Sequence, residues 1–263
     1  MNPQAVDPAL EDNPEWQKIL TEGHKPLLFL RSVMRRLPHE PRCKVCSNPF
    51  GGVGGKIVGW AGFRPSRKNP NMCGNCCDGL DPGGALVDIG ILFADIRGST
   101  TFGEKVGAAE FAGVLTRFYH VATDVLLAHD AMIDKLLGDE VMALFIPGMT
   151  GQDYRRKTCE AGLALVQAAQ EDRTLREGMQ IGVAVHGGPA FVGNVGVPGV
   201  VDFTALGDTV NTAARLQSLA QPGELVISED LCNSVTGPKL DGERRLVELK
   251  GKAEPFAIRV VRP

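Results

Sequence analysis

Residues 87–101 read VDIGILFADIRGSTT and combine an apolar run, an aspartate and a turn rich in Gly, Ser and Thr. The segment 87–94 is mostly apolar, as expected of a buried β-strand, and Asp95 ends it. A turn rich in Gly, Ser and Thr follows and leads into a helical pattern. A strand that passes through such a turn into a helix presents free backbone N–H groups to an anion. The stretch therefore predicts a carboxylate beside an anion-binding turn.

A second carboxylate lies in the tight turn Gly138-Asp139, between predicted strands at 132–137 and 141–146. Aspartates at two strand ends can share Mg²⁺ ions, which bind a few carboxylates and leave positions open for phosphate oxygens. Each aspartate taken alone is more typical of a helix cap or a turn. Only the combination indicates a metal site.

The remaining pattern mixes helices and strands without an ordered βαβ series. This mixture favours an α+β sandwich, with helices on one face of a largely antiparallel sheet. Helices are predicted over 108–129, 154–171 and 208–220, and further strands over 180–185, 201–206, 225–228, 245–249 and 257–261.

Three polar residues on these elements could serve a phosphate-bearing ligand. Asn211 and Arg215 lie four positions apart, so they share one helix face. Arginine makes a fork to phosphate, and asparagine both donates and accepts hydrogen bonds. Lys135 interrupts an otherwise apolar strand, which is also typical of a lysine at a sheet edge. Exposed helices often carry such residues, so the pair alone is a weak signal.

Four strings, taken in order, resemble the motifs of class III nucleotidyl cyclases. They are FADIRGST at 93–100, KLLGD at 135–139, TALGDTVNTAAR at 204–215 and KGK at 250–252. The intervening HGGPAFVGN at 186–194 fits the central hairpin of that family. The resemblance covers residues 85–263, and it implies a ferredoxin-like palm sandwich for the catalytic domain.

The resemblance also implies an adenylate cyclase that converts ATP to 3′,5′-cyclic AMP and pyrophosphate. Asp95, Asp139 and the carbonyl of Ile96 would hold two Mg²⁺ or Mn²⁺ ions, and the ribose 3′-hydroxyl would attack the α-phosphorus in line. The other implied roles contact the nucleotide: Gly98, Ser99 and Thr100 at the β- and γ-phosphates, Asn211 at the ribose, Arg215 at the α-phosphate and Lys250 at the terminal phosphates.

The expected base is adenine. Lys135 has only donors, adenine N1 accepts a hydrogen bond, and guanine N1 carries a proton that would oppose the lysine. In the family a glutamate at this position goes with guanine. Thr204 holds the partner position, where its hydroxyl can accept from the adenine amino group. Lys with Thr resembles the bicarbonate-responsive subclass, so activation by bicarbonate is a hypothesis.

The resemblance implies a homodimer, because the active site of this family lies between two chains. Asp95 and Asp139 would come from one chain, and the nucleotide-binding residues from the other. Since this chain carries both sets, a symmetric dimer would hold two equivalent sites.

Five of the seven cysteines fall between positions 43 and 77. Cys43-x2-Cys46 and Cys73-x2-Cys76 form a double CxxC set that can close a tetrahedral site. Structural zinc is favoured, with an iron–sulfur cluster and a redox disulfide switch as alternatives. The gap of 26 residues is wider than in a usual zinc ribbon. His39 and Cys77 are spare ligand candidates, while Cys159 and Cys232 receive no role.

The sequence thus divides into a helical lead-in at 1–40, a Cys-rich metal-binding segment and linker at 41–84, and a catalytic domain at 85–263. The lead-in carries apolar residues at 27, 30, 34 and 37. The glycine-rich insert 51–62, with Trp60 and Phe63, is expected to pack over the cysteine site. A metal or redox change just before the first catalytic strand could regulate the enzyme.

Composition excludes several classes of function. The net charge of −3 and 6% aromatic residues argue against a nucleic-acid binder. The longest uncharged stretch, 178–201, is too rich in glycine and polar residues for a membrane span, and the N-terminus lacks signal-peptide features, so a cytoplasmic protein is expected. The alternative function is a catalytically silent, nucleotide-binding signalling module of cyclase type.

Overall fold

The computed structural model describes residues 13–22, 42–43, 46–66, 72–78, 83–197, 200–237 and 240–263. The predicted helical pattern at 27–37, His39 and the side chain of Cys77 lie outside the described residues. Within the described ranges, no helix is long and apolar enough to cross a membrane.

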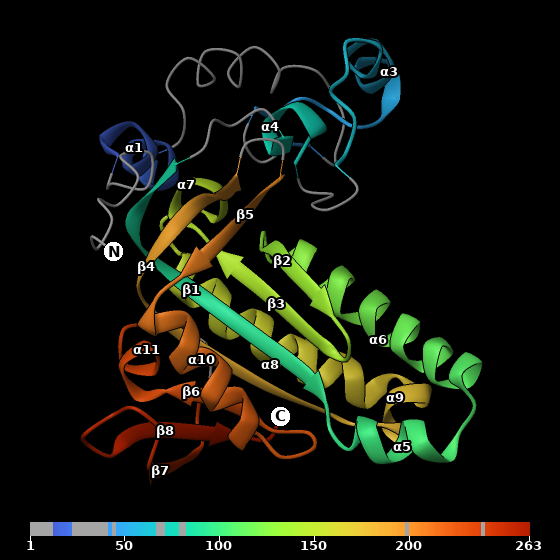
Figure 1. Ribbon diagram of the computed structural model, residues 1–263, viewed down its shortest axis with the longest axis vertical. Helices are drawn as coiled ribbons and strands as arrows, with labels where there is room; N and C mark the ends of the chain where they lie inside the picture. Colours follow the sequence, from blue (N-terminus) through green and yellow to red (C-terminus); the bar gives the residue numbers. More distant parts are fainter. Residues whose placement is uncertain are drawn as a thin grey trace, which may run out of the picture.

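One mixed sheet forms the centre of the molecule, with the strand order β2-β3-β1-β4-β6-β8-β7 and with β5 paired to β4 (Figure 1). Every pairing is antiparallel except that of β4 with β6, which confirms the largely antiparallel α+β sheet. The strands are β1 (Gly83–Ile96), β2 (Met132–Leu137), β3 (Glu140–Phe145), β4 (Ile181–Val197), β5 (Val200–Leu206), β6 (Leu225–Ser228), β7 (Glu243–Val247) and β8 (Phe256–Val261).

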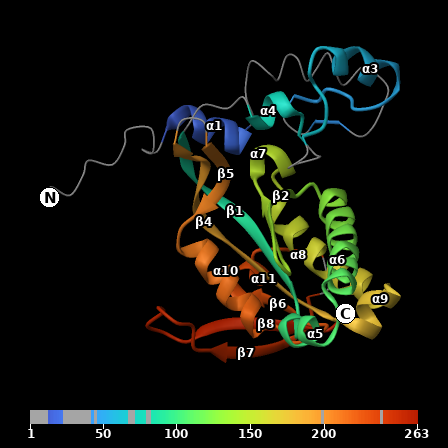
Figure 2. The same cartoon turned by 45° about the vertical axis from the view of Figure 1, so that its right-hand side comes forward.

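Helices cover both faces of this sheet rather than the single face expected. Alternate side chains of β1 point to opposite faces, and both sets are buried. Leu92 packs with α6 (Ala108–Ala128), α8 (Tyr154–Glu171) and α9 (Arg173–Gly178). Ile91 packs on the other side with α1 (Pro14–Glu22) and α10 (Asp208–Leu219). Figure 2 shows β1 between α10 and α6.

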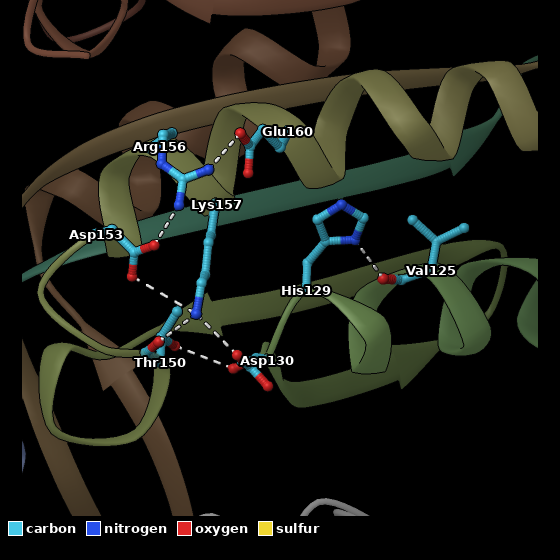
Figure 3. Close-up of polar contacts among 8 residues, drawn as sticks. All are labelled: Val125, His129, Asp130, Thr150, Asp153, Arg156, Lys157 and Glu160. Carbon is cyan, nitrogen blue, oxygen red and sulfur yellow. Dashed lines mark hydrogen bonds and ion pairs between the residues drawn. The ribbon is translucent and has the colours of Figure 1, made fainter. Parts of the chain in front are cut away.

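A polar network fixes the corner where α6 leads into β2 against the start of α8 (Figure 3). Lys157 donates to a carboxylate oxygen of Asp130 and to the carbonyl of Thr150, each at 2.8 Å. Asp130 has a left-handed backbone with φ of 60°, a conformation that aspartate tolerates better than most residues. These contacts tie the turn before β2 to α7 (Pro147–Thr150) and to the start of α8.

The described residues of the Cys-rich segment include regular secondary structure that its composition did not predict. It contains α3 (Gly52–Trp60) and α4 (Gly74–Asp78), and β1 begins at Gly83, inside the expected linker. The expected packing of Trp60 over the cysteines is wrong, because this side chain is 95% exposed. The α3 face that packs inward is a glycine face: a Cβ on Gly55 would lie 2.6 Å from a backbone carbon of Phe50. Phe63 does pack against the cysteine core.

The remaining elements are α5 (Ser99–Lys105), α7 (Pro147–Thr150) and α11 (Glu229–Asn233). The predictions at 132–137, 154–171 and 225–228 match β2, α8 and β6 to the residue. The strand predicted at 180–185 instead continues to Val197 as β4, and the strand predicted at 245–249 lies two residues earlier as β7. The residues 186–194 therefore lie on a strand of the β4–β5 hairpin.

Candidate active site

The two predicted carboxylates lie together at one end of the sheet. Asp95 is opposite Glu140 in the β1–β3 register, and the Ile96 amide donates to the carbonyl of Asp139 at 3.3 Å. Gly138 precedes that aspartate with φ of 61°, a backbone conformation that glycine adopts without strain. The β2–β3 turn is therefore tight enough to bring the carboxylate of Asp139 to the end of β1.

Burial, and then the neighbouring carboxyl of Asp139, raise the pKa of Asp95 to about 6, while Arg97 acts in the opposite direction. Arg97 pairs with Oδ2 of Asp95, and Ser99 donates its hydroxyl to Asp139. Oδ1 of Asp95 is buried, and among the described residues it has no hydrogen-bond partner. A buried carboxylate oxygen of this kind, beside a second carboxylate, suits a divalent cation.

Sequence reasoning missed three residues around this carboxylate pair. Arg97 lies within the first motif, Glu140 follows Asp139 directly, and Gln217 of α10 lies close enough to lower the pKa of Asp95. Burial and Asp139 raise the pKa of Glu140. The spacing of Arg97, two residues after Asp95, was the available signal for an ion pair at the strand end.

The second group of residues gathers around Lys135. Its ammonium lies 2.8 Å from Asp202 and 3.1 Å from the hydroxyl of Thr204. Thr204 in turn donates to Asp134 at 3.0 Å. The structure thus brings together Lys135 and Thr204, which are 69 residues apart in the sequence. Asp134 and Asp202 were not predicted, because no local pattern marks either as facing the lysine.

The third group lies on α10 and the loop after β7. Asn211 and Arg215 both belong to α10, and a Cβ on Gly251 would lie 3.3 Å from Nη1 of Arg215. The guanidinium therefore lies against the loop that carries Lys250. Lys250 is exposed, whereas Lys252 forms an ion pair with Asp208. Of the two lysines in this loop, Lys250 is thus the better placed to meet an external phosphate.

Within one chain the carboxylate pair lies at the β2–β3 turn and the end of β1, whereas the lysine group lies on β2 and β5. Lys135 is on β2, which ends at Leu137, and Asp139 lies in the turn beyond it. Leu137 lies between them and is 68% exposed, and Leu206, close to Thr204, is 46% exposed. Large apolar side chains left in solvent beside both groups are typical of a surface that a partner covers.

The four cysteines of the double CxxC set form one buried cluster. Their sulfur atoms lie within 4.8 Å of one another. Sγ of Cys46 is 3.8 Å from Sγ of Cys73, which is the edge expected of a tetrahedron with metal–sulfur bonds of about 2.3 Å. The amide of Cys73 and the side chain of Asn48 each point an N–H at a cysteine sulfur from 3.3 Å. Hydrogen bonds with Cys46 and then with the other two cysteines lower the pKa of Cys43.

The cluster packs against the catalytic domain. The cysteines share a hydrophobic core with α1 and β1, and the Trp16 ring centroid lies 6.1 Å from that of Phe203 on β5. Phe203 is the neighbour of both Asp202 and Thr204. Cys159 is fully buried, Cys232 is partly buried, and both are free thiols.

Residues 85–259 match the family of the adenylate and guanylate cyclase catalytic domain. An adenylate cyclase of Anabaena cylindrica is 30% identical over 182 residues, covering 64% of this chain and 35% of that protein. Adenylate cyclase 1 of Rhizobium meliloti is 30% identical over 138 residues, covering 50% and 21%. The chain thus spans about a third or less of the length of these relatives.

Two solved structures show the same fold at 27% identity. The guanylyl cyclase Cya2 aligns with a TM-score of 0.63 over 68% of this chain and 93% of that one. The adenylyl cyclase CyaB from P. aeruginosa aligns with a TM-score of 0.59 over 69% and 96%. One is named for guanine and the other for adenine, so the similarity leaves the choice of base to the residues of this chain. By its sequence, its sheet and its paired strand-end aspartates, this chain belongs to the class III nucleotidyl cyclases.

Proposed function

We propose that the protein is an adenylate cyclase, which converts ATP to 3′,5′-cyclic AMP and pyrophosphate. The observation that carries the choice of ATP is the contact between Lys135 and Thr204. The lysine offers donors to adenine N1, and the protonated N1 of guanine would leave two donors opposed. A buried polar mismatch of this kind discriminates strongly between two ligands.

The carboxylate pair serves the reacting phosphate. Asp95, Asp139 and the Ile96 carbonyl would hold two Mg²⁺ or Mn²⁺ ions, which supply the Lewis-acid chemistry of phosphoryl transfer. Asn211 orients the ribose, and Arg215 neutralises the charge that grows on the α-phosphate. Lys250 and the backbone of Gly98, Ser99 and Thr100 hold the β- and γ-phosphates.

The functional unit is a symmetric homodimer with two shared sites. Asp95 and Asp139 of one chain act on a nucleotide held by Lys135 and Arg215 of the other. The exposed leucines beside the two groups support this arrangement. The catalytic unit comprises residues 85–263.

The cysteine cluster, in the segment 41–84, is a structural zinc site. Sulfur atoms within 4.8 Å of one another leave room for one tetrahedral ion and not for a cube of four irons. Because the cluster packs beside β5, loss of the metal or oxidation of its thiols would reach the nucleotide pocket through Trp16 and Phe203. We propose that this coupling regulates turnover.

Incubation of the purified protein with ATP and either Mg²⁺ or Mn²⁺, followed by detection of cyclic product, tests the activity. A parallel reaction with GTP should give at least tenfold less product, on the order expected for a mismatched buried donor. Nucleotide binding without product would indicate the silent signalling module instead. Adding bicarbonate at constant pH tests the subclass: unchanged turnover would exclude a bicarbonate response.

A further inference from the structure

Asp134 is a buried carboxylate that the mechanism above does not use. It is 2% exposed, and its Oδ2 accepts from the Thr204 hydroxyl at 3.0 Å and lies 3.3 Å from the Lys135 ammonium. Burying a carboxylate is costly unless charge and hydrogen bonds compensate. The two side chains that contact Oδ2, Thr204 and Lys135, are those expected to read the base.

A β-bulge explains how neighbouring residues can meet the same hydroxyl. Consecutive side chains of a regular strand point to opposite faces. In the β2–β3 ladder, Ile133 pairs with Ala143 and Lys135 with the next residue along β3, Met142, so Asp134 is the extra residue of a bulge. The bulge turns Asp134 and Lys135 toward Thr204 together, at 3.0 Å and 3.1 Å from its oxygen.

The hydrogen-bond inventory of Thr204 then determines what this hydroxyl can accept or donate. A hydroxyl has one hydrogen to donate and two lone pairs. The hydrogen is directed to Asp134, and one lone pair receives Lys135. What remains toward a ligand is an acceptor. A base that meets Thr204 must therefore bring a donor.

We propose that Asp134 is a positioning residue that selects adenine by holding the Thr204 hydroxyl as an acceptor. The amino group at C6 of adenine is a donor and suits this acceptor, whereas the O6 carbonyl of guanine is an acceptor and opposes it. Without Asp134 the hydroxyl could rotate and donate to O6. The selection thus depends on a carboxylate that touches no part of the base. This inference rests on the proposed function and extends it.

The test is the ratio of kcat/KM for ATP to that for GTP. Asp134→Ala should lower this ratio about tenfold, mainly because kcat/KM for GTP rises. The Thr204 hydroxyl and guanine O6, two opposed acceptors in the wild type, can then form a hydrogen bond. Asp134→Asn should lower it less, because an amide oxygen still accepts without the charge. In a Thr204→Val background, Asp134→Ala should leave the ratio unchanged, because no hydroxyl remains to be oriented.

Asp88→Asn is the matched control, because Asp88 is also an ion-paired strand aspartate but contacts Arg155 and Tyr154 away from the lysine group. It should leave the ratio at the wild-type value. A ratio that stays within twofold in Asp134→Ala, or that changes equally with and without the Thr204 hydroxyl, would overturn the role of Asp134. Thermal melting of each variant identifies chains that fail to fold. If Asp134→Ala fails to fold, the ratio measured for Asp134→Asn, whose side chain has the same shape as that of the wild type, decides the test.

Calorimetric binding of nonhydrolysable ATP and GTP analogues with Mn²⁺ separates this inference from the proposed activity. Absence of cyclic product in the wild type would refute the cyclase, yet the dissociation constant of the GTP analogue divided by that of the ATP analogue should still fall in Asp134→Ala. Equal binding of both analogues by the wild type would refute the selection by Asp134.

Discussion

Mixing two inactive variants tests whether the site is shared between chains. Asp95→Ala removes a carboxylate from the metal side of the site, and Arg215→Ala removes the guanidinium from the nucleotide side. Each variant alone should lose about a hundredfold or more of its turnover, the usual cost of deleting a group that stabilises transition-state charge. If one chain supplies Asp95 and its partner supplies Arg215, a mixed dimer has one site with both defects and one intact site.

The size of the rescue follows from the dimer geometry. Random pairing of equal amounts gives about half mixed dimers, each with one intact site of two, and thus about a quarter of wild-type activity. A site formed within one chain would leave every chain defective, at about one per cent. The two arrangements therefore differ about 25-fold in the expected activity of the mixture.

Co-expression of the two variants with different affinity tags, and tandem purification of the mixed species, provides the assay. The tandem-purified dimer should reach about half of wild-type turnover, since one of its two sites is intact. Asp95→Ala mixed with Asp139→Ala is the control, because both changes lie on the same side and no intact site can form. Turnover of the first mixture no higher than that of this control would refute the shared site.

Three further outcomes follow from the described side chains. Cys43→Ala should remove the proposed zinc ion, measured by elemental analysis, whereas Cys159→Ala, an equally buried cysteine outside the cluster, should retain it. Burial is the chief cause that raises the pKa of Asp95 to about 6, and a metal ion requires the ionised carboxylate. The affinity for Mn²⁺, measured by calorimetry, should therefore fall about tenfold from pH 7 to pH 5. In Asp95→Asn the affinity should lack this dependence on pH, because the titrating carboxyl is gone. Burial lowers the pKa of His186 from 6.5 to about 4. Between these two pH values the imidazole is protonated in the unfolded chain and neutral in the folded chain. The free energy of unfolding should therefore drop by about 3 kcal/mol as the pH falls through this range. Urea titrations of His186→Asn, which can keep a hydrogen bond to Ser228, should lack that decrease, and an identical pH dependence would contradict the assignment.

Local patterns were sufficient for most of the catalytic domain. The alternation and bounds of β2, α8 and β6 could be read from the sequence because apolar spacing and turn residues act over a few positions. The same holds for Gly138, whose positive φ follows from a tight turn. Patterns failed at α3, because its inward face is built of glycine and carries no hydrophobic period. They also failed to predict that helices cover both faces of the sheet. An apolar strand pattern indicates that both sides are buried, but it does not identify the elements that cover them.

The sequence by itself determined the family, the two strand-end aspartates and the double CxxC set, because each is a short string whose chemistry depends on its own spacing. Only the tertiary structure decided that the four sulfurs converge within 4.8 Å and that Asp134 meets Thr204 across 70 residues of chain. The physical reason is that a bulge in one strand and the path of a distant hairpin set these distances. Neither feature is marked by a repeating pattern in the sequence.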